Sequence, residues 1–88
     1  MIYRIIFAEE TKKFFRKHPK LESKKIIKNL TLLAQDPYAP NNNIVKLSGT
    51  HSSYRLRVGD IRAVYELSPR TKTITVARIA PRSSIYKK

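Results

Sequence analysis

A two-residue turn between two alternating segments constrains this chain more than any other feature. Gly59-Asp60 separates Tyr54–Val58 from Ile61–Leu67, and both flanking segments alternate between two kinds of side chain. A Gly-Asp pair at such a junction is a strong local signal for a β-hairpin. If the turn holds only these two residues, Val58 pairs with Ile61, and the remaining pairs follow from it. We therefore predict a hairpin of defined register.

The predicted register sorts the hairpin side chains onto two faces. One face is almost wholly apolar and should enter the core: Tyr54, Leu56, Val58, Ile61, Ala63, Tyr65 and Leu67. The other face carries Arg55, Arg57 and Arg62, with only Glu66 at the far end to oppose their charge. Like charges directly opposed across a ladder cost roughly some tenths of a kcal/mol. Because arginine presents several donors in a planar fork, we interpret this cluster as an anion site.

The rest of the chain predicts an α+β fold. Strands are expected at Ile2–Phe7, Ile44–Leu47 and Thr73–Ile79, and helices at Ala8–His18 and Lys20–Asp36. The second helix should bury one apolar stripe: Ile26, Ile27, Leu30, Leu33 and Ala34. An N-terminal strand, a two-helix hairpin and an antiparallel β-meander predict helices packed on one sheet face, with residues 1–88 forming a single domain.

Composition narrows the classes of function. The chain has 19 Lys and Arg against six Asp and Glu, a net charge of +13, which favours a polyanion or an acidic protein as partner. There is no cysteine, so disulfides and thiolate metal sites are excluded. Two separate histidines and scattered acids predict no metal site. We see neither a signal peptide nor a membrane-spanning run, and we expect a soluble cytoplasmic protein without a membrane partner.

The segment YRLRVGDIRAVYEL, followed by a strand and by PRSSIYKK, resembles the RelE/ParE superfamily of toxins from type II toxin–antitoxin modules. The likeness covers nearly the whole chain and implies a RelE-like fold. For the RelE branch it implies a ribosome-dependent, metal-independent endoribonuclease that needs no cofactor. Such an mRNA interferase cuts mRNA in the ribosomal A site. The resemblance further implies a cognate, RelB-like antitoxin, acidic or amphipathic, that neutralises the toxin.

The resemblance also implies roles for individual residues. Arg55, Arg57 and Arg62 would bind the substrate phosphate, and the last two would also act in catalysis. Arg82 resembles the C-terminal arginine of the family, a further phosphate ligand or proton donor. Tyr86 resembles its C-terminal tyrosine, which stacks on a base or assists proton transfer. The best-studied branch has lysines in place of Arg55 and Arg57, and arginine is a poor base, so the proton acceptor stays unassigned.

Two further groups of basic residues have no assigned chemistry. Cations along the predicted helices fit a solvated helix face, and the alternative is collective binding of rRNA phosphates by Lys12, Lys13, Arg16, Lys17, Lys24 and Lys28. In the last strand, simple alternation places Arg78 on the apolar-facing side, where the pattern assigns it no role.

Sequence alone leaves two other functions open. A ParE-like toxin would inhibit DNA gyrase through protein contacts, without nuclease activity. That branch shares the fold but does not need the arginine cluster as a catalytic site. An RNA-binding module or a decayed toxin would bind nucleic acid and remain inert.

Overall fold

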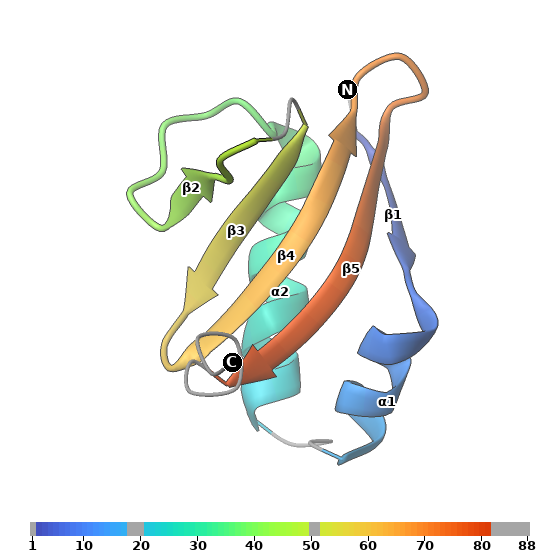
Figure 1. Cartoon of the computed structure of the whole chain (residues 1–88), viewed down its shortest axis with the longest axis vertical. Helices are drawn as coiled ribbons and strands as arrows, with labels where there is room; N and C mark the ends of the chain where they lie inside the picture. Colours follow the sequence, from blue (N-terminus) through green and yellow to red (C-terminus); the bar gives the residue numbers. More distant parts are fainter. Residues whose placement is uncertain (1, 18–20, 50–51, 82–88) are drawn as a thin grey trace.

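The computed structural model describes residues 2–17, 21–49 and 52–81. Within these ranges the elements follow in the order β1 (Arg4–Phe7), α1 (Glu9–Lys17), α2 (Leu21–Gln35), β2 (Ile44–Lys46), β3 (Ser53–Val58), β4 (Ile61–Ser68) and β5 (Thr73–Pro81). The strands form one sheet in the order β1-β5-β4-β3-β2, and α2 crosses behind it (Figure 1). The predicted α+β fold is confirmed. None of the helices in the described ranges is long and apolar enough to cross a membrane.

Strand β1 joins the sheet beside the last strand of the chain. It runs parallel to β5, with Arg4 opposite Thr73 and Phe7 opposite Val76, whereas all other neighbours are antiparallel. The backbone N–H of Tyr3 donates to the carbonyl of Ala34 at 2.8 Å, which ties the start of the chain to the end of α2. The sheet is therefore mixed, a pairing that the sequence pattern had left open for the first strand.

Helix α2 supplies most of the helical side of the core. Ile26, Leu30, Leu33 and Ala34 are buried, as the stripe predicts. The prediction for Ile27 was wrong, because this side chain is 48% exposed. Consecutive residues lie about 100° apart around a helix, so Ile27 points away from the sheet when Ile26 faces it. The stripe is thus narrower than the sequence pattern indicated.

The β3–β4 hairpin presents its apolar side to this helix. Buried residues on that side are Leu56, Ile61, Ala63, Tyr65 and Leu67, with Tyr54 and Val58 partly buried against the core. The rings of Tyr54 and Tyr65 stack at 5.6 Å between centroids. The predicted face assignment of the hairpin is confirmed, so the opposite side of the sheet carries the polar residues.

The turn at Gly59-Asp60 fixes where that polar side begins. Gly59 has a φ of 62°, and Asp60 is not among the described residues with positive φ. Positive φ at the first central position alone is the pattern of a type II′ turn, which favours glycine there and matches the twist of the flanking strands. Val58 pairs with Ile61 across this turn, as predicted.

Candidate functional site

The hairpin register brings the three predicted arginines onto the sheet face that lies opposite the helices. Arg57 pairs directly with Arg62, and Arg55 pairs with Val64. Both pairs are those that the turn predicts. Residues directly opposite in a ladder point to the same face, so the three guanidinium groups share one surface near the turn. Like charges are therefore concentrated on this part of the sheet, at a cost to the pairing of β3 with β4.

The three arginines differ in exposure. Arg57 is exposed and Arg55 is half-buried, whereas Arg62 is only 7% exposed. The Nη1 of Arg62 donates a long hydrogen bond of 3.4 Å to the carbonyl oxygen of Gly59. A charge with little access to water acts more strongly on a nearby anion than an exposed one does. Arg62 is therefore the strongest electrostatic centre of this group, and Arg57 is the most accessible one.

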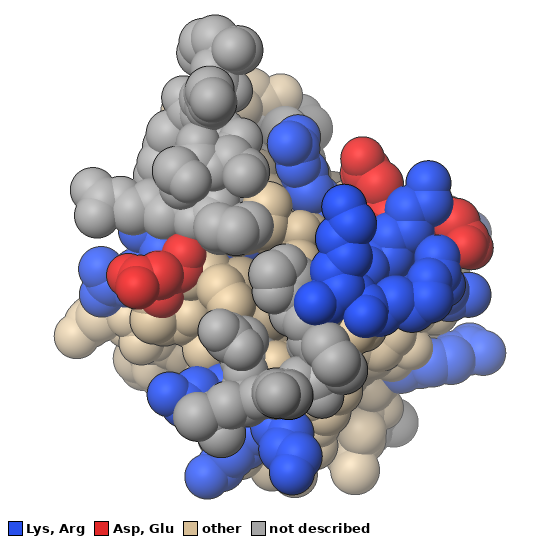
Figure 2. All heavy atoms as spheres, turned by 90° about the horizontal axis from the view of Figure 1, so that it is seen from below, with Lys and Arg blue, Asp and Glu red and all other residues tan. Residues whose placement is uncertain are grey.

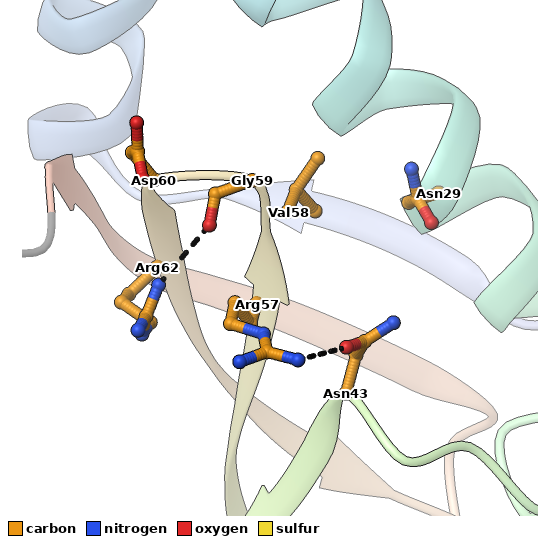
Figure 3. A pocket seen from close by; sticks show the side chains of 7 residues that line it. All are labelled: Asn29, Asn43, Arg57, Val58, Gly59, Asp60 and Arg62. Carbon is orange, nitrogen blue, oxygen red and sulfur yellow. Dashed lines mark hydrogen bonds between the residues drawn. The ribbon is translucent and has the colours of Figure 1, made fainter.

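Asn43 holds Arg57 through two hydrogen bonds, a contact that the sequence analysis missed. The backbone N–H of Arg57 donates to the Asn43 carbonyl at 2.9 Å, and its Nη2 donates to Asn43 Oδ1 at 2.9 Å (Figure 3). The pairing of β2 with β3 accounts for this contact: Ile44 lies opposite Leu56, so Asn43 lies opposite Arg57. Asn43 therefore orients the accessible guanidinium without itself carrying a charge.

A β-bulge adds a fourth arginine to this face and corrects the prediction for Arg78. Val64 pairs with Arg78, whereas its neighbour Tyr65 pairs with Val76, so Ala77 is the extra residue. A bulge shifts the alternation of a strand by one residue. Arg78 accordingly lies on the face of Val64 and Arg55, and it is exposed. The burial pattern agrees with the bulge: Val76 and Ile79 are both buried, although they stand three residues apart instead of two.

The tip of the hairpin and the neighbouring helix border a shallow pocket of about 460 Å³. Its lining residues are Asn29, Asn43, Arg57, Val58, Gly59, Asp60 and Arg62. The side chain of Asp60 points away from Arg57 and Arg62, and Asn29 approaches from α2 (Figure 3). The lining thus includes two guanidinium groups, two amides and one carboxylate, and the guanidinium groups point away from Asn29 (Figure 3). Guanidinium groups are well suited to binding phosphate oxygens.

The sequence analysis assigned no proton acceptor, and Tyr65 on the hairpin is no acceptor for this face. Burial raises the pKa of Tyr65 above its ordinary value, and Tyr54 adds to that shift. Tyr65 therefore stays protonated, and it lies on the core side of the sheet. Arg82 and Tyr86, the other predicted catalytic residues, lie outside the described residues. In the described ranges, no group of three or more His, Asp or Glu residues is placed to hold a metal ion.

A second basic region covers the helices. The six predicted rRNA-binding cations are all exposed: Lys12, Lys13, Arg16, Lys17, Lys24 and Lys28. Figure 2 shows Lys and Arg side chains gathered at the side of the molecule where α1 lies, with acidic side chains next to them. The acids in the first turn of α1 are Glu9 and Glu10, so this region is not uniformly positive.

The family comparison decides what kind of protein carries this site. The family of the ParE toxin of the type II toxin–antitoxin system parDE matches residues 5–86. The chain belongs to the RelE/ParE toxin superfamily. It is a toxin of a type II toxin–antitoxin system. A comparison of this toxin with curated proteins gave no match.

Solved structures of toxin–antitoxin complexes resemble the toxin along nearly its whole length. A chain of the archaeal RelE–RelB complex from Pyrococcus horikoshii OT3 has a TM-score of 0.80 at 27% identity, covering 93% of the toxin and 97% of that chain. A chain of the RelB–RelE complex from Methanococcus jannaschii has a TM-score of 0.67 at 32% identity, covering 93% of the toxin and 95% of that chain. A chain of the intact E. coli RelBE complex shares the fold, with a TM-score of 0.76 at 22% identity, covering 90% of the toxin and 95% of that chain.

Proposed function

We propose that this toxin is a ribosome-dependent endoribonuclease that cuts mRNA in the ribosomal A site without a catalytic metal. One observation carries the proposal: Arg55, Arg57 and Arg62 share the helix-free face of the sheet, where a purely structural sheet would avoid such a concentration of charge. The similarity to chains of archaeal RelE–RelB complexes supports the same branch of the superfamily.

The proposed reaction uses the RNA's own 2′-hydroxyl as nucleophile. Its oxygen attacks the adjacent phosphorus, the bond to the 5′ oxygen breaks, and the products end in a 2′,3′-cyclic phosphate and a 5′-hydroxyl. One proton leaves the 2′-hydroxyl and one reaches the leaving oxygen. Donors aimed at the charge that develops in the transition state commonly make the largest contribution to such a reaction. The toxin's arginines fit this electrostatic part of catalysis.

Different arginines serve different steps in this proposal. Arg57, exposed and oriented by Asn43, receives the reacting phosphate, and Arg55 binds the phosphate backbone of the substrate beside it. Arg62, with its low exposure, stabilises the charge on the pentacoordinate phosphorus. Arg82 and Tyr86 are proposed to bind the phosphate and to assist the proton transfers, on the strength of their resemblance to the family's C-terminal arginine and tyrosine. The proton acceptor is none of the arginines named above, Arg55, Arg57, Arg62 and Arg82, because arginine is a poor base.

Replacing Asn43 with alanine should weaken cleavage by loosening Arg57. The variant loses the side-chain hydrogen bond to Nη2 and keeps the backbone bond, so we expect roughly a fivefold loss, as about 1 kcal/mol implies. Single-turnover cleavage of ribosome-bound mRNA measures the effect. Asn42→Ala, in the same exposed loop, is the matched control and should leave the rate unchanged. Equal rates for the Asn43 and Asn42 variants would rule out this positioning role.

We further propose that a RelB-like antitoxin, acidic or amphipathic, binds and neutralises this toxin. The relatives from P. horikoshii and M. jannaschii were solved as complexes of RelE with RelB. The net charge of +13 favours an acidic segment in the partner. Co-expression with the neighbouring open reading frame tests this. Co-purification of the two products and relief of growth arrest are expected, and a toxin that purifies alone from such cells would contradict the proposal.

The six helical cations are proposed to guide the toxin to the ribosome by contacts with rRNA phosphates. Such contacts release counterions, so ribosome binding should weaken steeply as salt rises. Replacing Lys13 and Arg16 by glutamine should flatten the salt dependence of binding. An unchanged dependence would leave these residues as a solvated helix face.

A second candidate function rests on the family that matches residues 5–86, which is that of ParE toxins. In this alternative the toxin inhibits DNA gyrase through protein contacts and has no nuclease activity. A supercoiling assay separates the two, since gyrase inhibition with intact mRNA would reverse the preference. Growth arrest on induced expression excludes an inert RNA-binding module.

A further inference from the structure

The β-bulge at Ala77 builds a second row of cations beside the first. The first arginine row runs across the sheet through Arg57 and Arg62, which are directly paired. The second arginine row runs through Arg55 and Arg78, which flank Val64 from its two neighbouring strands. Without the bulge, Arg78 would stand on the core side of β5. The bulge therefore places a cation where simple alternation would not.

The two rows are separated by one repeat of the strands. Equivalent positions in neighbouring rows differ by two residues, as Arg55 and Arg57 do, which corresponds to about 7 Å along a strand. That separation is comparable with the spacing of neighbouring phosphates on an extended single strand of nucleic acid. Each row holds two guanidinium groups on adjacent or next-but-one strands, and guanidinium is suited to binding phosphate by two parallel hydrogen bonds.

The next row along the same face has the opposite charge. Glu66 lies there, between Ser53 and Thr75, and it accepts a hydrogen bond from Ser52 Oγ at 3.2 Å. A carboxylate at this position repels a third phosphate. The described part of this face is thus positive over two rows and negative at the third, which limits the length of a polyanion that it can follow.

From this arrangement we propose that Arg55 and Arg78 form a second phosphate site, which binds the backbone phosphate next to the one held by Arg57 and Arg62. The ligand class is single-stranded RNA, and the proposal rests on the proposed nuclease function for the identity of the first site. Arg78 acts as a positioning residue: it binds a phosphate that does not react and so places its neighbour in the first row.

Binding of a fluorescent octauridine RNA to the whole toxin, without ribosomes, tests this site. For single strands each phosphate contact contributes about 0.7 to the slope of log affinity against log salt. The ratio of wild-type to Arg78→Ala affinity should therefore shrink about 2.6-fold between roughly 50 and 200 mM salt. Arg70→Ala removes the same charge from the exposed β4–β5 turn and should leave the slope unchanged. Arg78→Lys should restore the slope, and Glu66→Gln should strengthen binding.

Three results would overturn the second site. The Arg78 and Arg70 variants could show the same slope as wild type, or both could show the same reduced slope, which would make the effect one of net charge. Arg78→Ala could also weaken the binding of a heptaglutamate peptide as much as the binding of the RNA. That result would indicate a surface for an acidic protein segment. Failure of the nuclease proposal would give a different result. If A-site mRNA stays intact while Arg78→Ala still lowers the salt slope of RNA binding as expected, only the nuclease proposal is contradicted.

Discussion

The Arg62→Ala variant is expected to cut A-site mRNA roughly 10²- to 10³-fold more slowly than the wild-type toxin, the usual cost of removing a donor that stabilises transition-state charge. Arg62 is the least exposed of the hairpin arginines, at 7%, and it lies directly opposite Arg57. Loss of its charge should therefore lower the single-turnover rate more than the affinity for the programmed ribosome. Quench-flow measurement at saturating toxin separates the two effects.

The control for this variant must address folding, because Arg62 is buried and bonds to the turn at Gly59. Arg62→Lys retains the charge and loses the fork, so it should recover part of the rate. Arg70→Ala, in the exposed β4–β5 turn, should cleave like wild type. A folded Arg62→Ala protein, with an unchanged urea midpoint and a wild-type rate, would remove Arg62 from the mechanism.

The largest effect on stability is expected from Leu30→Ala. Leu30 is 1% exposed and joins α2 to the sheet within the core cluster. Truncating a buried leucine removes apolar contacts and leaves a cavity, so the free energy of unfolding should fall by about 2–5 kcal/mol. For a domain of this size that is a large share of a total of roughly 5–15 kcal/mol. Urea denaturation followed by circular dichroism measures the change.

Leu32→Ala is the matched control on the same helix. This leucine is 56% exposed, and surface substitutions of this kind usually change stability by less than about 0.5 kcal/mol. Leucine and alanine have similar helix propensities, so the comparison isolates burial. If both variants lose the same stability, α2 does not pack on the sheet as described.

The hairpin shows how far local sequence can specify a site. One turn, Gly59-Asp60, determines that Val58 meets Ile61, and alternation then carries Arg57 to Arg62 and Arg55 to Val64. Each step uses only neighbouring residues, so no knowledge of the rest of the fold is needed. The same logic predicts the core side of the hairpin, including the fully buried Tyr65.

The errors arose where the regular periods break or where a distant partner decides. Arg78 was placed on the wrong face because a bulge at Ala77 interrupts the two-residue period of β5. Ile27 was placed in the core because it is apolar and adjacent to Ile26, and the sequence pattern does not distinguish the buried residue of such a pair from the exposed one. The parallel pairing of β1 with β5 joins segments almost 70 residues apart, and no local pattern encodes it. The roles of Arg82 and Tyr86 remain predictions.

The central claim is that this toxin cuts mRNA in the ribosome, and its most direct test is a purified translation reaction. Ribosomes are stalled with a defined codon in an empty A site, toxin is added to saturation, and the mRNA ends are mapped. We expect a single ribosome-dependent cut within the A-site codon that leaves a 2′,3′-cyclic phosphate, while free mRNA stays intact. Intact A-site mRNA, together with inhibition of gyrase supercoiling by the same preparation, would contradict the claim.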